Sequence, residues 1–463
     1  MKPELIDFTD GIQKIKKKEV RKLYKEYLNP GLGFLKGLLG FDRNFVRAEG
    51  VKVWDDNGEE YLDFLGAYGA LNFGHNPPRI LEMVKEVMGR PNLLQASVNP
   101  LECIAAHNLA QITPGNLKRT FFCNSGAEAV EGAIKLARAA TAKTKIISCE
   151  GSFHGKTLGA LTATGREKYR APFKPLIPEF VQIPFGDTDA LEIELKKGDV
   201  AAFIVEPIQG EGGIILPPPG YLRKVREICD QYEVLLIVDE VQTGFGRTGF
   251  NFAVEKDEVV PDIMCFAKSI GGGVMPVGAF HTSAEVWDKA YGGVEKCTLH
   301  TSTFSGNTLA MAAVIGAIKE LVENDLAALA HKKGAYLLKG LKTLQEKYSL
   351  IKEVRGEGLM IGIEFAEAKG VLNTLTGGKV NQISKEYLGA MVAGELLNRH
   401  NIITAYTLNN PNVIRLEPPL VVSYEEMDRV LNGLEDIFSR KGSLLGMALA
   451  STGTMVKSIF KSK

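Results

Sequence analysis

The chain has 463 residues, 45% of them apolar, with 55 Lys and Arg against 55 Asp and Glu. Single cores rarely grow beyond roughly 250–300 residues, so we expect two domains or a large domain with a smaller one. The zero formal net charge excludes a general electrostatic affinity for nucleic acid. Glycine is enriched, with 49 residues and no collagen period, so these glycines should lie at particular turns.

The N-terminal thirty residues are charged and lack the apolar stretch of a secretory signal. No apolar run approaches the roughly 20 residues that a membrane-spanning helix needs. The six cysteines and seven histidines have no metal-binding spacing, which favours buried free thiols over a metal site. We therefore predict a cytoplasmic protein. The uncharged stretch 442–456 fits a frayed or partner-packed terminus better than a weak membrane contact.

Residues 1–70 predict a helix followed by strands. Apolar residues at helical spacing predict an amphipathic helix over 12–27, which ends before Asn29-Pro30. Residues 45–64 resemble antiparallel strands, with a hairpin turn at 55–58. Because chain termini often lie close together, we expect this segment to pack with a C-terminal domain.

Residues 71–324 predict a large α/β domain. Short apolar runs alternate with helical stretches, which is typical of a mostly parallel sheet covered on both faces. The predicted strands are 120–123, 145–149, 201–206, 234–241 and 262–267. Residues 325–463 predict a smaller α+β domain, with charged helices over 327–348 and 385–399 and a strand over 359–365.

Two glycine-rich segments imitate nucleotide-binding motifs. Gly151 to Thr157 ends in Gly-Lys-Thr, but three residues separate its glycines where a P-loop has four. Gly244 to Gly249 matches G-x-G-x-x-G, but the residues after it have no helical period. Both features argue against a nucleotide-binding protein.

A third segment is a better candidate for a phosphate site. Asn124-Ser125-Gly126 stands between an apolar strand and an amphipathic helix. The free N–H groups of such a helix start can bind phosphate, although an ordinary strand–helix turn would have the same pattern.

Downstream residues identify the kind of ligand. Asp239 and Glu240 follow a strongly apolar strand, and Lys268 follows another, so both ends lie on the ligand-binding edge of a parallel sheet. A lysine that can form a Schiff base, an acid for a ring nitrogen and a phosphate anchor are the requirements of pyridoxal phosphate.

At this point the sequence resembles the class III (subgroup II) pyridoxal-phosphate-dependent aminotransferases, from about residue 45 to 435. The resemblance implies fold-type I, with a mostly parallel seven-stranded sheet in the large domain. Within the family it is most similar to the putrescine aminotransferases, notably at 214–222 and 408–410. The motifs that carry the resemblance are Asn124-Ser-Gly-Ala-Glu-Ala, Phe153-His-Gly, Glu206-Pro-Ile-Gln-Gly-Glu-Gly, Asp239-Glu-Val-Gln-Thr-Gly, Ala267-Lys-Ser, His300-Thr-Ser-Thr-Phe-Ser-Gly and Ile414-Arg-Leu-Glu-Pro-Pro-Leu.

The resemblance implies a role for each matching cofactor residue. Lys268 is the Schiff-base lysine and moves the substrate proton, while Asp239 keeps the ring nitrogen protonated. Glu240 stays outside the site. The remaining expected cofactor residues are Phe153 and His154 at the ring, Gln242 at the ring oxygen, and Ser125, Gly126 and Ala127 at the phosphate. Thr303 is expected to reach the phosphate from the neighbouring subunit, so the resemblance implies a homodimer, or a tetramer containing it.

Three further positions bear on the substrate. Arg415 matches the residue that grips a substrate carboxylate, and Glu206 matches an acid that can pair with that arginine when the substrate has none. Lys156 stands where relatives acting on amino acids usually have Arg. We therefore predict ping-pong transfer of an amino group from a diamine, such as putrescine or cadaverine, to 2-oxoglutarate. The alternatives are an ornithine, acetylornithine or other ω-amino-acid aminotransferase, and an amino-acid racemase or epimerase.

Overall fold

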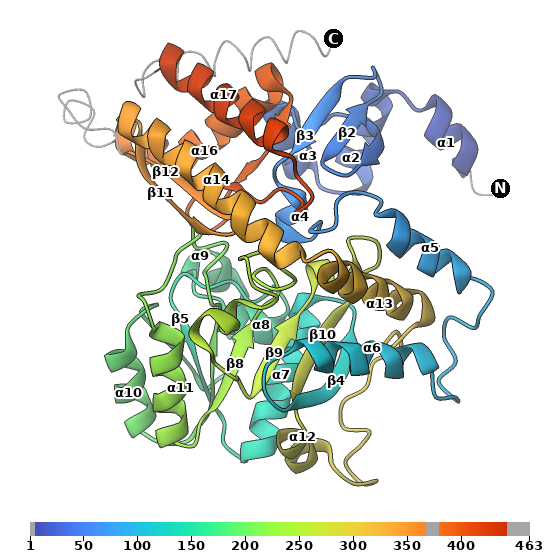
Figure 1. The fold of residues 1–463 in the computed structure, drawn as a ribbon, viewed down its shortest axis with the longest axis vertical. Coiled ribbons are helices and arrows are strands. Elements are labelled where there is room, and N and C mark those ends of the chain that lie inside the picture. The colour runs from blue at the N-terminus through green and yellow to red at the C-terminus, as the bar shows by residue number, and fades with distance from the viewer. Residues whose placement is uncertain (1–4, 367–378, 442–463) are drawn as a thin grey trace.

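The computed structural model describes residues 5–366 and 379–441, and its fold is α/β (Figure 1). The large sheet has seven strands, in the order β4-β10-β9-β8-β7-β5-β6. The pairs from β9 through β6 are parallel, whereas β10 is antiparallel to both of its neighbours. The strands are β4 (Leu117–Cys123), β5 (Lys145–Cys149), β6 (Phe180–Ile183), β7 (Val200–Val205), β8 (Leu235–Asp239), β9 (Ile263–Phe266) and β10 (Gly278–Ser283).

The central strands are buried on both faces. Every residue of β7 is buried, and alternate residues point to opposite sides. Phe203 and Val205 belong to one apolar cluster, whereas Ala202 and Ile204 belong to another. The sheet thus separates two cores, as expected for a parallel sheet covered by helices on both faces. The strands predicted from 120 to 267 are present; β6 and β10 were not predicted, because neither is a continuous apolar run.

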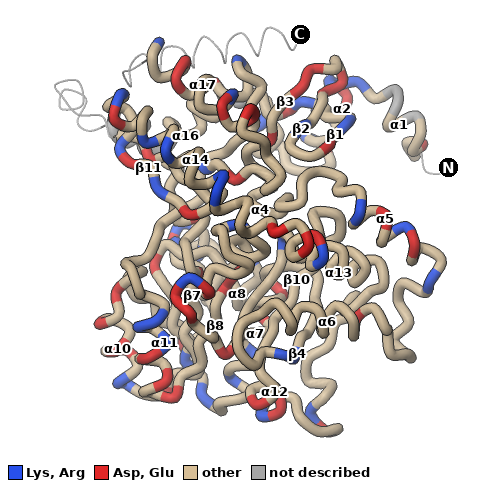
Figure 2. The backbone as a smooth tube through the Cα atoms, viewed as in Figure 1, with Lys and Arg blue, Asp and Glu red and all other residues tan. Residues whose placement is uncertain are grey.

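Helices cover this sheet, and acidic and basic residues lie interspersed along the outer ones (Figures 1 and 2). Helix α7 packs against β7, β9 and β10. The helices of this part are α5 (Pro78–Glu86), α6 (Pro100–Ile112), α7 (Gly126–Thr141), α8 (Leu158–Ala163), α9 (Glu167–Arg170), α10 (Thr188–Lys196), α11 (Tyr221–Gln231), α12 (Ala284–Tyr291) and α13 (Thr308–Glu323), with 3-10 turns η1 (Ala171–Phe173), η2 (Ala253–Asp257) and η3 (Lys268–Gly271).

The N-terminal segment differs in part from the prediction. Two helices, α1 (Phe8–Lys14) and α2 (Lys17–Tyr27), replace the single predicted helix, because the chain is extended at Lys16. A third helix, α3 (Pro30–Leu39), was missed. It starts because the Asn29 side chain accepts a hydrogen bond from the Leu32 N–H while Pro30 occupies the first turn.

The predicted hairpin is present. Strands β2 (Lys52–Asp55) and β3 (Glu60–Asp63) pair antiparallel around a turn in which Asp55 Oδ1 accepts hydrogen bonds from the N–H groups of Asn57 and Glu59. Strand β1 (Phe45–Glu49) pairs with β2, and β13 (Ile402–Ile403) pairs with β3 in parallel. N-terminal and C-terminal residues therefore share one sheet.

The C-terminal part contains a third sheet, of order β11-β12-β15-β14, and long helices. The elements are α14 (Leu326–Lys347), β11 (Ile351–Glu357), β12 (Met360–Phe365), α16 (Lys379–His400), β14 (Ala405–Tyr406), β15 (Val413–Leu416) and α17 (Tyr424–Lys441). The stretch 442–456, interpreted above as a frayed terminus, lies outside the described residues. Within 5–366 and 379–441, no helix is long and apolar enough to cross a membrane.

Candidate active site

A cavity of about 520 Å³ opens at the carboxyl ends of the strands of the large sheet. This edge is where ligands bind in parallel sheets, because the loops that follow the strands diverge there. Sequence-predicted residues from distant segments meet around it: Ser125, Gly126, Ala127, Phe153, His154, Glu206, Asp239, Gln242 and Lys268 all line the cavity.

The first turn of α7 forms one wall. The Ser125 hydroxyl caps the helix by accepting a hydrogen bond from the Glu128 N–H at 3.2 Å. Gly126 packs so closely that an added Cβ would lie 3.1 Å from Val241 and 3.4 Å from Ala267. The remaining N–H groups of this turn, with the positive end of the helix dipole, suit an anion such as a phosphate.

Lys268 is the second residue after strand β9, and it lines the cavity. It is half-buried and has the left-handed φ of 52°, a conformation that non-glycine residues rarely adopt. Burial lowers the pKa of Lys268 below its ordinary value, although the carboxylates of Glu417 and Glu211 oppose the shift. A larger fraction of the amine is therefore neutral and able to act as a nucleophile or accept a proton.

Asp239 and His154 form a buried pair in the lining of the cavity. Asp239 Oδ2 lies 2.8 Å from His154 Nδ1, and Asp239 Oδ1 accepts a hydrogen bond from the Val241 N–H at 3.0 Å. Burial alone would lower the pKa of His154, but the hydrogen bond with Asp239 raises it above its ordinary value. His154 Nε2 is buried and has no hydrogen-bond partner among the described residues.

Glu206 supports the Phe153 segment. Its Oε1 accepts a hydrogen bond from the Phe153 N–H at 2.9 Å, and its Oε2 accepts one from the Gly210 N–H at 3.2 Å. Burial is the main cause that raises the pKa of Glu206 to about 7. The carboxyl group therefore braces the loop that carries Phe153.

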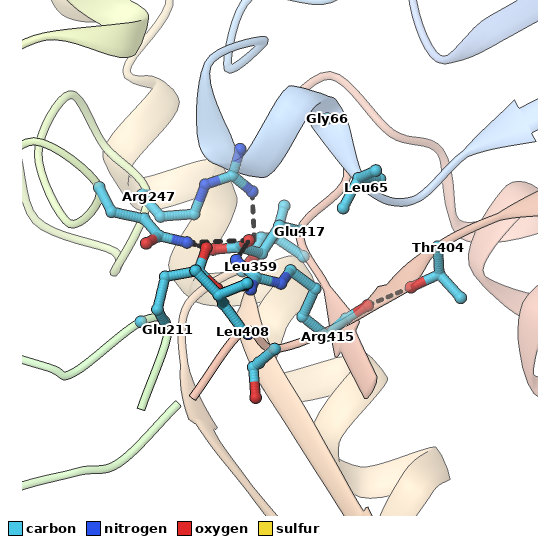
Figure 3. Close-up of polar contacts among 12 residues, drawn as sticks. Leu65, Gly66, Glu211, Arg247, Leu359, Thr404, Leu408, Arg415 and Glu417 are labelled. Carbon is cyan, nitrogen blue, oxygen red and sulfur yellow. Dashed lines mark hydrogen bonds and ion pairs between the residues drawn. The ribbon is translucent and has the colours of Figure 1, made fainter. Parts of the chain in front are cut away.

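Arg415 pairs with Glu211 in this structure and not with Glu206, the acid expected to pair with it when a donor without a carboxylate is bound (Figure 3). Arg415 Nη2 lies 2.6 Å from Glu211 Oε2, and Arg415 Nη1 lies 3.4 Å from Glu417 Oε2. Both carboxylates raise the pKa of Arg415 against the effect of burial. Glu206 instead accepts hydrogen bonds from two backbone N–H groups, those of Phe153 and Gly210.

Glu417 links Arg415 to the cavity wall. The Gln242 amide donates hydrogen bonds to Glu417 Oε1 at 2.7 Å and Oε2 at 3.0 Å. Arg415 itself lies over the ring of Tyr68, 5.1 Å from its centroid, and the Arg415 Nε atom is buried with no hydrogen-bond partner among the described residues. Glu417, Tyr68 and Glu211 were not predicted as site residues. Glu211 and Glu417 lie inside two of the family motifs, and Glu417 directly follows β15, two residues after Arg415, whereas Tyr68 belongs to no such motif.

Three predicted residues lie outside the cavity lining: Arg415, described above, and also Lys156 and Thr303. The exposed Lys156 places its Nζ 5.5 Å from the centroid of the Tyr169 ring. Thr303 is exposed, and its backbone oxygen accepts a hydrogen bond from the Gln95 amide at 2.6 Å. In a single chain, neither residue borders the cavity.

The two nucleotide-like motifs have other structural roles. The helix start after Gly151–Thr157 is filled by Glu131, whose Oε1 accepts hydrogen bonds from the Thr157 hydroxyl at 2.7 Å and the Gly159 N–H at 2.8 Å. In the Gly244–Gly249 segment, the buried Arg247 binds the backbone oxygens of Leu359 and Pro418. The Glu131 carboxylate occupies the helix start after the first motif, and Arg247 fixes the second motif to the backbone of other segments. Neither motif therefore forms a phosphate-binding loop.

The donor set fits pyridoxal phosphate. A helix start for a phosphate, a half-buried lysine and a buried carboxylate border one cavity, and Phe153 provides an aromatic face. Within residues 5–366 and 379–441 no cluster of His, Cys, Asp and Glu could hold a metal ion. Fold and site together define a pyridoxal-phosphate-dependent enzyme of fold-type I.

Comparisons with known proteins identify the family. The family described as aminotransferase class-III matches residues 40–438, so the chain belongs to the class-III aminotransferases and is a pyridoxal-phosphate-dependent aminotransferase. The ornithine aminotransferase from Toxoplasma gondii is 32% identical, with a TM-score of 0.82 over 93% of this chain and 98% of that one.

Two other solved structures show how broad the similarity is. The (S)-enantioselective omega-transaminase from Thermomicrobium roseum is 33% identical, with a TM-score of 0.78 over 86% of this chain and 92% of that one. The acetylornithine aminotransferase from Elizabethkingia anophelis is 31% identical, with a TM-score of 0.74 over 91% and 98%. These relatives differ in their named substrates, so the donor has to be argued from the residues of this chain.

Proposed function

We propose that this aminotransferase takes a terminal amino group from a diamine, of the putrescine or cadaverine type, and gives it to 2-oxoglutarate. The observation that carries the proposal is the 2.6 Å ion pair between Glu211 and Arg415. A donor with a carboxylate at that end must displace Glu211 before it can reach the arginine. A diamine has no such group, so it binds with the ion pair intact.

The charges around Arg415 support a cationic donor. Two carboxylates, Glu211 and Glu417, face one guanidinium, so the group as a whole attracts a distal ammonium. Burial opposes the ionisation of Glu211, but Arg415 keeps the pKa of Glu211 below its ordinary value. Glu211 is therefore ionised near neutral pH.

The position of Lys156 is also consistent with a diamine. Its Nζ lies against Tyr169 and outside the cavity lining, and an ammonium has no planar fork for a carboxylate. Within the described residues, position 156 thus provides no second side chain that binds a donor carboxylate.

The cavity residues divide the work of the reaction. When bound, pyridoxal phosphate supplies an electron-withdrawing ring that acidifies the C–H bond next to the donor nitrogen. Lys268 accepts that proton and returns it, since burial favours its neutral amine. Asp239, oriented by His154, would hold the proton on the ring nitrogen.

The remaining residues hold the reactants. The backbone N–H groups of Ser125, Gly126 and Ala127 would hold the phosphate, and Phe153 and Gln242, which line the same cavity, would hold the ring. In the second half-reaction Glu211 leaves Arg415, and the free guanidinium binds a 2-oxoglutarate carboxylate through two parallel hydrogen bonds.

Donor and acceptor preferences can be tested separately. Purified enzyme with 2-oxoglutarate should turn over putrescine and cadaverine faster than ornithine or 4-aminobutyrate, and keto-acid dependence excludes a racemase. Arg415→Gln should keep most of its reaction with putrescine in a single turnover while losing about 100-fold or more in the 2-oxoglutarate half-reaction. Preferred turnover of ornithine or 4-aminobutyrate, with loss of both half-reactions in Arg415→Gln, would refute the proposal.

The second candidate is an ornithine or acetylornithine aminotransferase. It is favoured by the similarity of the whole chain to the ornithine aminotransferase of Toxoplasma gondii. The same donor panel decides between the two, because only this candidate requires a donor with a carboxylate.

We further propose a homodimer in which Thr303 contributes to the partner's phosphate site. The exposure of Thr303, outside the cavity of its own chain, supports this arrangement. Mixing Lys268→Ala subunits with Thr303→Ala subunits tests it. A trans contribution restores one complete site per mixed dimer, whereas a cis contribution leaves every site defective.

A further inference from the structure

We propose that residues 407–410 form a latch that holds Glu211 on Arg415, and that Arg166 and Tyr169 anchor this latch. These residues are positioning residues that set the balance between a closed state, with Arg415 covered, and an open state that accepts a carboxylate. The inference rests on the proposed use of Arg415 for 2-oxoglutarate.

The latch contacts Glu211 at two places. Glu211 Oε2 accepts a hydrogen bond from the Leu408 N–H at 2.7 Å, and the Glu211 backbone oxygen accepts one from the Asn409 N–H at 2.8 Å. The same Oε2 atom faces Arg415 Nη2 at 2.6 Å. A rotation that takes this oxygen off the arginine therefore also breaks its bond to Leu408, so the latch opposes opening.

The latch is tied to the loop that carries Phe153. The Asn409 side-chain amide donates hydrogen bonds to the backbone oxygens of Gly151 at 2.8 Å and Ser152 at 3.3 Å. These two residues directly precede Phe153, which lines the cavity. The latch thus joins Glu211 to the cavity wall through the backbone N–H and the side-chain amide of Asn409.

Helix α9 supplies the outer anchor. The Leu408 backbone oxygen accepts a hydrogen bond from Arg166 Nη1 and another from the Tyr169 hydroxyl at 3.4 Å. Arg166 also lies over the Tyr169 ring, 5.3 Å from its centroid. The Leu408 oxygen shares its peptide group with the Asn409 N–H, which donates to the Glu211 backbone oxygen. The two side chains therefore orient the peptide next to the one whose N–H holds the Glu211 carboxylate.

Lys156 completes this arrangement. Its Nζ lies over the Tyr169 ring at 5.5 Å, within the range of a cation–π contact. Lys156 therefore packs on the ring of Tyr169 and does not line the cavity. This gives Lys156 a role at the outer end of the same chain of contacts.

The latch should affect the two half-reactions unequally. A ligand that binds only the open state has an apparent Kd divided by the fraction of enzyme in that state. If opening is rare, loosening the latch raises this small fraction and tightens 2-oxoglutarate binding in proportion. The closed fraction remains near one, so the affinity for a diamine barely changes.

Two variants weaken the anchor by different routes. Arg166→Gln removes the guanidinium, and Tyr169→Phe removes only a hydroxyl. Losing one hydrogen bond of this kind should lower the apparent Kd for 2-oxoglutarate by about three- to tenfold. The putrescine half-reaction should change by less than about twofold. Lys168→Gln, at an exposed position of α9, is the matched control and should change neither.

The measurement follows the visible absorbance of the holoenzyme in single turnovers, with each half-reaction initiated separately. The decisive step is a double-mutant cycle with Glu211→Ala, in which no Glu211 carboxylate covers Arg415. In that background Arg166→Gln should no longer alter the 2-oxoglutarate Kd. The latch is refuted if the effect persists there, if both half-reactions weaken together, or if neither anchor variant changes the 2-oxoglutarate Kd.

Failure of the latch and failure of the diamine proposal have different signatures. The cycle measures 2-oxoglutarate binding to enzyme that has already received an amino group, whichever donor supplied it. Poor turnover of putrescine by the wild-type enzyme would refute the donor while leaving this result valid.

Discussion

The adjacent carboxylates Asp239 and Glu240 should respond to substitution in opposite ways. Asp239 ends β8 and lines the cavity, whereas Glu240 follows it and points away. Glu240 Oε1 accepts a hydrogen bond from the Val254 N–H at 3.0 Å, and its other oxygen accepts one from the Thr243 hydroxyl. We therefore expect Glu240→Gln to change stability and to leave catalysis nearly intact.

The magnitude follows from the pKa of Glu240, which burial raises from its ordinary value of 4.5 to about 7. A folded-state pKa above the unfolded one stabilises the fold at low pH, and this contribution disappears as pH rises through about 7. The shift corresponds to about 3 kcal/mol between pH 4 and pH 8. Glutamine does not titrate, so the Glu240→Gln variant should not lose this contribution. As pH rises, its free energy of unfolding should increase relative to that of the wild type by up to about 3 kcal/mol.

The stability of Glu240→Gln at acid pH depends on the hydrogen bonds that its side chain can make. The glutamine amide offers one oxygen to the two donors that Glu240 serves, so one donor loses its acceptor. This loss should cost about 1–3 kcal/mol at pH 5. The variant is thus less stable than the wild type at pH 5 and approaches or exceeds it at pH 8.

Denaturation midpoints of the holoenzyme from pH 5 to 8 measure this difference, with turnover recorded on the same samples. Asp239→Asn is the matched control, because it is the same change one residue earlier and should lower turnover by about 100-fold or more. The reasoning fails if Glu240→Gln loses activity comparably, or if its stability depends on pH as that of the wild type does.

Three further outcomes are expected. Lys268→Ala should abolish transamination and the visible absorbance of the protein-bound imine, and retention of either would remove this lysine from its role. Gly132→Ala should destabilise the protein by about 1–3 kcal/mol without changing donor preference, because the new Cβ would overlap the Phe280 ring; an unchanged denaturation midpoint would contradict this packing. Only the exposed Cys103 and Cys297 should react with a thiol reagent in the native protein, whereas all six should react after denaturation; more than two native thiols would contradict the burial of the others.

Local sequence was sufficient for the parts of the site that follow a strand directly. Asp239 and Lys268 each come after an apolar run, so their position on the ligand edge follows from the direction of a parallel strand. Ser125 and Gly126 were recognisable for a similar reason, since a strand, a small-residue turn and an amphipathic helix are consecutive in the chain.

The sequence alone could not show whether Glu206 or Glu211 pairs with Arg415. Both belong to one seven-residue motif, and either could reach an arginine two hundred residues away. In the structure, backbone N–H groups of Phe153 and Gly210 occupy Glu206, whereas Leu408 presents Glu211 to Arg415. Such partners are decided by how loops from separate segments meet.

The amino-acid sequence by itself thus determined the class of fold, the cofactor and the residues at strand ends, because periodicity and strand direction are local properties. The tertiary structure alone decided which carboxylate covers Arg415, where Lys156 points, and that β10 runs against its neighbours. Those features depend on contacts between residues far apart in the chain, and burial makes each of them specific, since a buried charge requires a partner.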